Sequence, residues 1–190
     1  TRLNLNNNME NSHKSDQELL DVPEDPMQQT PLHGKWTFSF TNSKGSNFKN
    51  YGEHIDQIGT FQTVEHFWRI YDHIIKPHDM GNHMDIQLFK YGIKPTWEDQ
   101  ANKEGGKLVF VINKKGFISK YWEDMVLAVI GEQFDVGSEI CGIVLSLRHQ
   151  EDRIAVWNRN SNNQEAINRI ADTMGKLLKL PNYIVDKMLD

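Results

Sequence analysis

Lys35-Trp36-Thr37-Phe38-Ser39-Phe40-Thr41 is the stretch that says most about the fold, because aromatic and polar side chains alternate along it. Successive residues of a strand point to opposite faces of a sheet, so this alternation predicts a strand with one face in a core. Compositions typical of strands recur further along, at Asp85–Lys90, Lys107–Asn113, Ile140–Arg148, Arg153–Asn158 and Tyr183–Met188. A tight charged turn joins the ranges 140–148 and 153–158, which predicts an antiparallel pair.

Three segments have helical rather than strand-like spacing of their apolar residues. The first runs from Thr63 to a stop at Pro77, and the second runs from Ser119, a plausible N-cap, to Gly131. The third opens at Ser161-x-x-Gln164, which fits a capping box. Strands joined by short turns, together with three amphipathic helices, predict an α+β fold in which helices cover one face of an antiparallel sheet. The other face is then open to bind a ligand.

The chain of 190 residues divides into a tail and one domain. Residues 1–30 are rich in Asn and acidic side chains and hold no aromatic residue, whereas all five Trp and all nine Phe lie in residues 31–190. Too little apolar surface is present in the tail to offset the entropy of ordering it, so we expect it to be flexible. A short partner-binding turn at Leu19, Leu20 and Val22 is the alternative.

The charge balance restricts the partners that this chain can have. The formal net charge is -5, from 21 Lys and Arg against 26 Asp and Glu, which argues against a protein that grips long nucleic acid. Residues 1–30 carry two of the basic and six of the acidic side chains, so the domain itself is close to neutral and can hold one small basic site. The single Cys141 excludes a disulfide scaffold, and no apolar run approaches a membrane span. An intracellular location without a membrane segment is expected.

Trp97 and Glu98 stand in a long loop with the sequence Gly92-Ile93-Lys94-Pro95-Thr96-Trp97-Glu98-Asp99. An exposed indole attracts a flat cationic ring, and a neighbouring carboxylate can accept from two adjacent N–H groups, as on a guanine edge. The alternative is that Trp97 packs beneath its own loop while Glu98 is solvated.

Arg148 and Arg153 flank the turn between two predicted strands, where two cations on one side would suit phosphate oxygens. Glu151 and Asp152 lie between them and argue against a strong phosphate site. Ordinary cross-strand salt bridging is the alternative.

Four histidines and two carboxylates, at 66, 73, 78, 79, 83 and 85, would be the basis of a metal-dependent hydrolase, although their spacing does not match a zinc motif.

Several spaced motifs occur in order along the domain: Pro31-Leu32 before Trp36, Thr63-Val64-Glu65-x-Phe67-Trp68, Trp97-Glu98-Asp99-x-x-Asn102-x-x-Gly105-Gly106-Lys107, Gly131-Glu132-x-Phe134, Cys141-Gly142 and Val156-Trp157-Asn158. Over about residues 31–185 the chain resembles the translation initiation factor 4E family, which binds the cap of messenger RNA. The resemblance implies a curved antiparallel sheet of about eight strands backed by three α-helices. It places the 7-methylguanine base of the cap in the concave face.

The resemblance also assigns roles to individual residues of the cap site. Trp97 would be one wall of a base sandwich with Tyr51 as the other, Glu98 would bind the guanine N1 and N2 hydrogens, and Trp157 would contact the methyl group. The triphosphate would be bound by Lys107, Arg148 and Arg153. Methylation makes the base cationic, so two aromatic faces and a carboxylate would distinguish it from unmodified guanine.

Departures from the initiation factor itself point to the 4E-homologous protein subfamily. Tyr51 stands where the initiation factor has tryptophan, and Gln150 stands where it has a basic phosphate ligand. Trp36, in contrast, matches the initiation factor better. We expect weaker cap binding than that of the initiation factor, both from Gln150 and from a short C-terminal loop.

A second site is implied on the convex side of the sheet. Residues corresponding to the family's surface for a helical Tyr-x-x-x-x-Leu peptide are Pro31, Val64, Trp68, Asp124 and Leu127. An apolar groove with an aromatic anchor is what helix-in-groove recognition requires. The alternative, favoured by periodicity alone, is that Trp68 belongs to an ordinary helix–sheet core.

Taken together, the sequence predicts a non-enzymatic cap-binding protein of the 4E-homologous type that regulates translation initiation. It is expected to be a cytoplasmic monomer, with the nucleus as a further compartment, and to need no cofactor or metal. The alternatives are a conventional initiation factor that recruits ribosomes through a scaffold protein, a metal-dependent hydrolase, and an interaction module without ligand binding.

Overall fold

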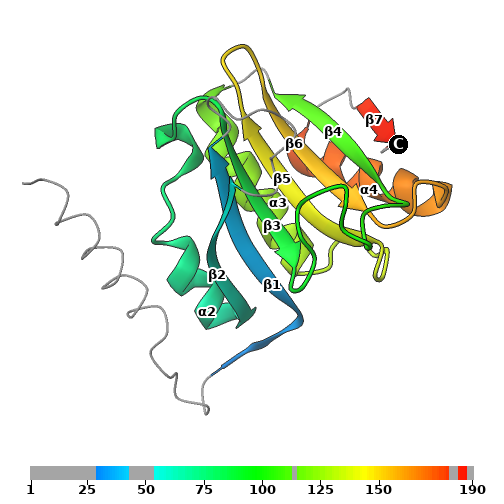
Figure 1. The fold of residues 1–190 in the computed structure, drawn as a ribbon, viewed down its shortest axis with the longest axis horizontal. Helices are drawn as coiled ribbons and strands as arrows, with labels where there is room; N and C mark the ends of the chain where they lie inside the picture. The colour runs from blue at the N-terminus through cyan, green and yellow to red at the C-terminus, as the bar shows by residue number, and fades with distance from the viewer. Residues whose placement is uncertain (1–28, 43–53, 113–114, 180–183, 188–190) are drawn as a thin grey trace, which may run out of the picture.

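The structure, a computed structural model, describes residues 29–42, 54–112, 115–179 and 184–187. Seven strands in these ranges form one sheet in the order β2-β1-β3-β5-β6-β4-β7, and every neighbouring pair is antiparallel (Figure 1). The strands are β1 (Pro31–Asn42), β2 (Ile55–Thr63), β3 (Met84–Lys90), β4 (Gly106–Ile112), β5 (Ile140–Leu147), β6 (Asp152–Asn158) and β7 (Ile184–Lys187). About eight strands were expected.

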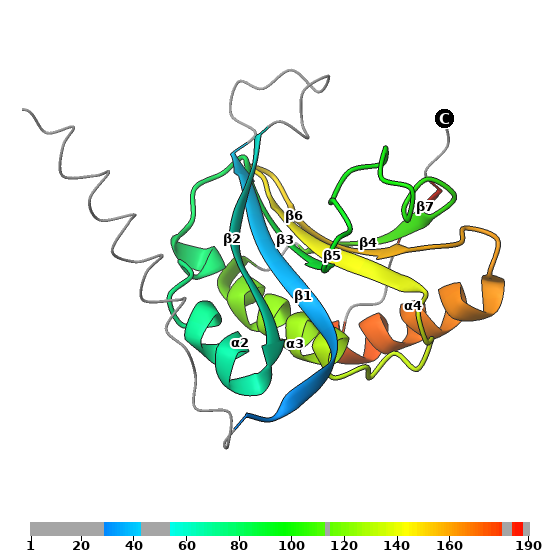
Figure 2. The same cartoon turned by 60° about the horizontal axis from the view of Figure 1, so that its bottom comes forward.

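Helices cover one face of this sheet, as the sequence predicts. They are α2 (Val64–Tyr71), α3 (Ile118–Ile130) and α4 (Gln164–Leu178), with short 3₁₀ turns η3 (Pro77–Asp79) and η4 (Lys115–Phe117). Figure 2 shows all three α-helices on one side of the curved sheet, and the loop between β3 and β4 on the other. The predicted α+β fold is therefore confirmed.

Aromatic packing between sheet and helices explains why the alternation in β1 matters. Trp36 and Phe38 are buried on the helix side, and the Phe38 ring lies 5.4 Å from Phe61 of β2 and 6.3 Å from Phe67 of α2. Phe67 in turn stacks on Tyr71 at 5.2 Å. Buried aromatic pairs at such distances add to the stabilisation from apolar burial, so this cluster fixes α2 against β1 and β2.

Three local predictions are wrong in detail. The first helix ends at Tyr71 rather than near Pro77, with Thr63 as its N-cap. Ser119 does not cap α3, since its Oγ instead accepts from the backbone N–H of His78 at 3.1 Å. In α4 the cap is Asn163, whose side chain accepts from the N–H of Ala166, and no capping box forms at Ser161.

Strand β2 was not predicted at all. Only Phe61 is fully buried in its sequence, Ile55-Asp56-Gln57-Ile58-Gly59-Thr60-Phe61-Gln62-Thr63, so no clear alternation of apolar residues is present. Its place is set by pairing with β1 and by α2, since a Cβ at Gly59 would lie 2.9 Å from Cδ1 of Ile70. Nearly all of the predicted tail, residues 1–30, lies outside the described residues.

Candidate functional site

The sheet face opposite the helices brings together residues from four adjacent strands. Cross-strand register aligns Phe89 of β3 with Gly142 of β5, Gly142 with Trp157 of β6, and Trp157 with Lys107 of β4. Arg153 lies four residues before Trp157 on the same strand and therefore on the same face. Trp157, Lys107 and Arg153, all predicted from the sequence as site residues, thus share one surface.

A small apolar cluster forms the floor of this face. Phe89 is buried there and meets Trp157 edge to face, with ring centroids 5.5 Å apart and an interplanar angle of 76°. The ring of Phe89 has room because residue 142 is glycine, where a Cβ would come within 2.4 Å of the ring. The half-buried Trp157 is thereby held by a buried neighbour while part of its ring stays accessible.

The loop from Tyr91 to Gly105 carries Trp97 and Glu98 and is braced from within. Asn102 is fully buried, and its Nδ2 donates to the carbonyl oxygens of Lys94 and Thr96, both at 2.8 Å. Asp99 accepts from the backbone N–H groups of Lys94 at 2.8 Å and of Ala101 at 2.9 Å. Thr96 is buried, whereas Trp97 directly after it is 63% exposed. The alternative that Trp97 packs beneath its own loop is therefore wrong.

Contacts at the base of this loop join it to the sheet floor. Ile93 and Ala101 pack against the buried cluster that contains Phe89, as Trp157 does, and Sγ of Cys141 donates to the carbonyl oxygen of Ala101 at 3.4 Å. Burial raises the pKa of the Cys141 thiol, which keeps the thiol neutral and unreactive. The loop that holds Trp97 is thus in direct contact with the sheet that holds Trp157.

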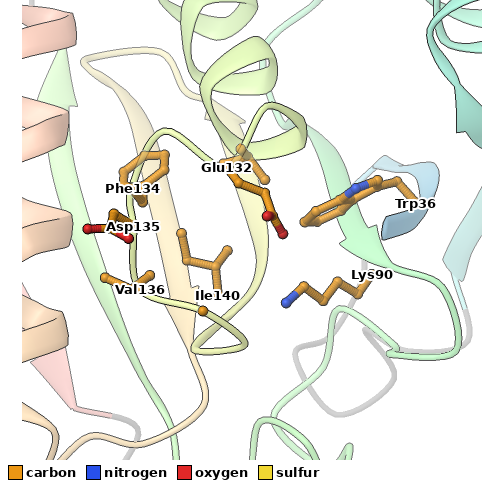
Figure 3. Close-up of a pocket in the computed structure, with 9 residues that line it drawn as sticks. Trp36, Lys90, Glu132, Phe134, Asp135, Val136 and Ile140 are labelled. Atoms are coloured by element: carbon orange, nitrogen blue, oxygen red, sulfur yellow. The ribbon is translucent and has the colours of Figure 1, made fainter. Parts of the chain in front are cut away.

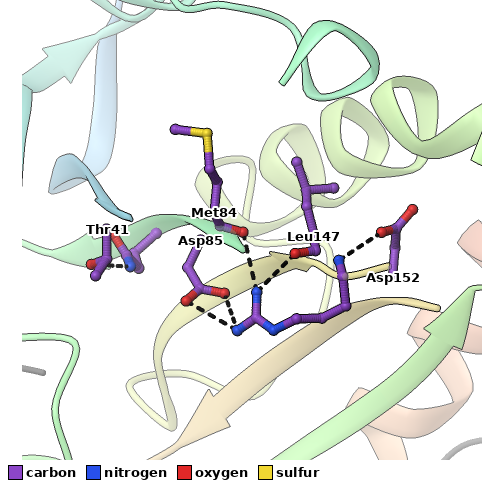
Figure 4. A network of polar contacts seen from close by, with 7 residues as sticks. Thr41, Met84, Asp85, Leu147 and Asp152 are labelled. Atoms are coloured by element: carbon purple, nitrogen blue, oxygen red, sulfur yellow. Dashed lines mark hydrogen bonds and ion pairs between the residues drawn. The ribbon is translucent and has the colours of Figure 1, made fainter. Parts of the chain in front are cut away.

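Arg148 is held by the protein itself. Its Nη2 lies 2.8 Å from the carboxylate of the buried Asp85, and its Nη1 donates to the carbonyl oxygen of Leu147 at 2.9 Å (Figure 4). The backbone N–H of Arg148 donates to Asp152 at 3.1 Å, so Asp152 shapes the turn. Salt bridging, the alternative interpretation, therefore applies to Arg148, with a partner on β3.

A second polar network lies on the same face, next to Asp85. Gln87, two residues further along β3, accepts from Oγ of Ser39 at 3.1 Å and donates to Oγ1 of Thr41 at 3.0 Å. All of these side chains are nearly or fully buried. Buried polar groups need partners, so the network explains why β1 tolerates buried polar residues on the face away from the helices.

Arg153 is also paired, but at the surface. Oε1 of Glu151 accepts from its Nη2 at 2.6 Å and from its Nε at 3.0 Å, and the Arg153 side chain is 54% exposed. Lys107 is half-buried in β4, opposite Trp157. Tyr51, predicted as the second wall of the base sandwich, lies outside the described residues.

The predicted peptide surface lies on the helix side of the sheet. Trp68 of α2 is 38% exposed, with its ring 4.8 Å from Phe67 and 6.0 Å from Tyr71. The ring therefore rests on the aromatic core without being enclosed by it, so Trp68 is not a plain core residue. Val64, Leu127 and Asp124 are partly buried, Pro31 is exposed, and Asp124 pairs with Lys120 at 2.8 Å.

A pocket of about 150 Å³ also lies on the helix side, at the ends of β1, β3 and α3 (Figure 3). Figure 3 shows the Trp36 ring, the Lys90 ammonium and the Glu132 carboxylate at one end of it. Burial lowers the pKa of Lys90. The rest of the lining comes from Val129, Phe134, Asp135, Val136, Gly137 and Ile140. None of the residues that the sequence predicts for cap or peptide binding lines this pocket.

The described ranges contain neither a metal site nor a membrane-spanning helix. Among these residues no group of three or more His, Cys, Asp and Glu side chains could hold a metal ion. His78 instead pairs with Asp79 at 3.3 Å, and His73 contacts the carbonyl oxygen of Arg69. No helix within the described part of the chain is long and apolar enough to cross a membrane.

The family model described as Eukaryotic initiation factor 4E matches residues 31–186. The chain therefore belongs to the eukaryotic initiation factor 4E family, whose members are non-enzymatic proteins. The match confirms the predicted family and the prediction that the protein is not an enzyme.

Relatives in nematodes and plants are similar over most of the chain. Eukaryotic translation initiation factor 4E-4 of Caenorhabditis elegans is 42% identical over 156 residues, which cover 81% of this chain and 73% of that protein. Eukaryotic translation initiation factor NCBP of Triticum aestivum is 40% identical over 158 residues, covering 82% and 68%.

Solved structures support the fold independently. The complex of C. elegans eIF4E-3 with the 4E-binding protein Mextli and a cap analog has a TM-score of 0.77 at 30% identity, covering 84% of this chain and 93% of that one. Ascaris suum eIF4E-3 with an m7G cap has a TM-score of 0.76 at 32% identity, covering 86% and 96%.

Several residues that shape the site were not identified from the sequence in these roles. Phe89 supports Trp157, Asp85 holds Arg148, and Asn102 braces the loop of Trp97. Asn102 does follow Asp99 by three residues in a long loop, where Asx side chains often bond to nearby backbone groups. Phe89 and Asp85 carry no such local signal, because their partners come from other strands.

Proposed function

We propose that this chain binds the 7-methylguanosine cap of messenger RNA and regulates translation initiation. The observation that carries the proposal is the exposed indole of Trp97, presented beside Glu98 by a braced loop and connected to the floor that holds Trp157. A methylated guanine is cationic, so it favours aromatic faces, and a carboxylate accepts from its N–H edge. The related Ascaris suum protein is seen with an m7G cap.

In this proposal the base is bound by Tyr51, Trp97, Glu98 and Trp157, and the phosphates by Lys107, Arg148 and Arg153. The position of Trp157, Lys107 and Arg153 on one sheet face supports the assignment. Base stacking contributes on the order of 1–3 kcal/mol per base, and exposed cations contribute less. The aromatic residues are therefore expected to dominate affinity.

We place the chain in the 4E-homologous subfamily. The run Gln150-Glu151-Asp152 supports this, because its neutral Gln150 stands where the initiation factor has a basic phosphate ligand. Similarity to 4E-4 of C. elegans and to the plant NCBP proteins points the same way. This placement predicts a cap affinity lower than that of the conventional initiation factor. The alternative is that the chain is itself a conventional initiation factor.

The convex face is proposed to receive a helical peptide with a Tyr-x-x-x-x-Leu motif at Pro31, Val64, Trp68, Asp124 and Leu127. Exposure of Trp68 on α2 supports the proposal, since an apolar groove needs an aromatic anchor that the peptide can reach. Related proteins are seen in complex with Mextli and with 4E-BP. A monomer acting in the cytoplasm, without a cofactor, completes the proposal.

Retention on a 7-methylguanosine resin tests the two faces separately. We expect the wild-type chain and Trp68→Ala to be retained and eluted by free cap nucleotide, and Trp97→Ala to be lost in the wash. A synthetic Tyr-x-x-x-x-Leu helix should bind the wild-type chain and Trp97→Ala but not Trp68→Ala. Retention of Trp97→Ala at the wild-type level would show that the pocket is placed wrongly.

A further inference from the structure

The two arginines among the candidate phosphate ligands are paired with acidic side chains of very different accessibility. Asp85, the partner of Arg148, is 2% exposed, whereas Glu151, the partner of Arg153, is 35% exposed. Arg148 is also fixed by the carbonyl oxygens of Leu147 and Met84, while the hydrogen bonds that bind Arg153 in the structure go to Glu151. The ion pair of Arg148 is therefore a fixed part of the fold, whereas the ion pair of Arg153 can be displaced by a ligand.

The geometry of the second pair is that of an oxyanion bound to a guanidinium. One carboxylate oxygen of Glu151 accepts from Nε and Nη2 of Arg153, at 3.0 and 2.6 Å. The Nε–Nη2 edge is one of the two edges of a guanidinium that can donate two hydrogen bonds to a phosphate, so a phosphate that binds at this edge needs the same two donors. Glu151 and a phosphate cannot both occupy it.

From this geometry we infer that Glu151 is a specificity-determining residue that competes with the phosphate chain of the ligand for Arg153. The inference rests on the proposed function, and it concerns the contribution of the ligand's phosphates to affinity. Exposed ion pairs are weak, so a ligand can displace Glu151. Breaking that ion pair nevertheless offsets part of the binding free energy that the phosphate contact contributes. The site therefore selects for the methylated base and depends little on the number of phosphates.

Titration with 7-methylguanosine mono-, di- and triphosphate tests the inference. Glu151→Gln keeps the shape of the side chain and removes its charge. We expect it to bind the triphosphate roughly two- to five-fold more tightly than the wild-type chain, with a change below about two-fold for the monophosphate. Glu165→Gln is the matched control, because Glu165 pairs with the exposed Arg169 on α4, away from this face.

A double-mutant cycle separates competition for Arg153 from simple charge repulsion. In an Arg153→Gln background, the gain from Glu151→Gln should fall to less than half. A gain that persists in full, or an equal gain in Glu165→Gln, would overturn the inference.

The proposed function can fail separately from this inference. If binding depends on methylation, but the affinities for the mono-, di- and triphosphate are the same in the wild-type chain and in Glu151→Gln, only the role of Glu151 is overturned. Absence of binding to all three nucleotides by both proteins overturns the proposed function, and this inference with it.

Discussion

The buried side-chain amide of Asn102 donates a hydrogen bond to the carbonyl oxygen of Thr96, the residue directly before Trp97, at 2.8 Å. A second bond from the same Nδ2 reaches Lys94, also at 2.8 Å. One side chain therefore fixes the backbone on the approach to an exposed indole. A loop held in this way loses little entropy when a ligand stacks on it, which favours affinity.

Replacing Asn102 should weaken cap binding without touching any residue that contacts the ligand. Asn102→Ala leaves two carbonyl oxygens without this donor, which costs about 1–3 kcal/mol of stability. We expect a lower free energy of unfolding in urea and at least a several-fold weaker affinity for 7-methylguanosine triphosphate. Gln164→Ala, which removes an exposed amide bonded to Asn168, is the control and should change neither.

Gly142 should be sensitive to the smallest possible substitution. In Gly142→Ala the new Cβ would meet the Phe89 ring at 2.4 Å and the carbonyl oxygen of Leu88 at 2.6 Å, so the ring must move. Overpacking of this kind costs roughly 1–3 kcal/mol. Trp157, which rests on Phe89, should shift with it, and cap affinity should fall.

The matched control for that substitution is Gly175→Ala. Gly175 lies inside α4, and a Cβ there would meet nothing within 4 Å. Alanine is favoured over glycine in a helix by roughly 0.5–1 kcal/mol, so this variant should be more stable than the wild-type chain. Equal melting temperatures for the two variants would contradict the packing described around Phe89.

The ion pair between Asp85 and Arg148 should contribute to stability. Asp85→Asn leaves a partly buried guanidinium without its carboxylate, and we expect a loss of about 1–3 kcal/mol in the free energy of unfolding. Asp124→Asn, which breaks the pair with Lys120, should cost much less. Chemical denaturation of both variants checks the prediction, and similar losses would argue against a structural role for Asp85.

Cys141 should make stability depend on pH in the alkaline range. Burial raises the pKa of its thiol above the unfolded-state value of about 8.5, so the thiolate forms first in the unfolded chain. The stability contributed by the neutral thiol is present below pH about 8.5 and is lost as the pH rises towards the folded-state pKa. The free energy of unfolding of the wild-type chain, relative to Cys141→Ala, should therefore fall between pH 7 and pH 9.5 under reducing conditions. A constant difference would show that the thiol is not buried.

Much of the fold could be predicted because the pattern of apolar residues is local. The alternation in Lys35–Thr41 and the helical spacing after Thr63 both correspond to elements of the structure. β2 could not be predicted, because its place depends on pairing with β1 rather than on its own sequence. The ends of helices were the other weak point, since Asn163 and not Ser161 supplies the cap of α4.

The site divides in the same way between local and long-range information. Trp97 and Glu98 were identified from the sequence of one loop, and the structure does expose that indole. The partner of Arg148 could not be identified, because Asp85 reaches it only through the register between β3 and β5. Phe89 was missed for the same reason, as its neighbour Trp157 lies two strands away in the sheet.

Calorimetric titration of the full chain with 7-methylguanosine triphosphate and with unmethylated GTP tests the central claim most directly. Because the base becomes cationic only when methylated, the methylated nucleotide should bind at least about ten-fold more tightly. Trp97→Ala should remove that preference. Equal affinity for the two nucleotides, or a preference that survives Trp97→Ala, would contradict the account.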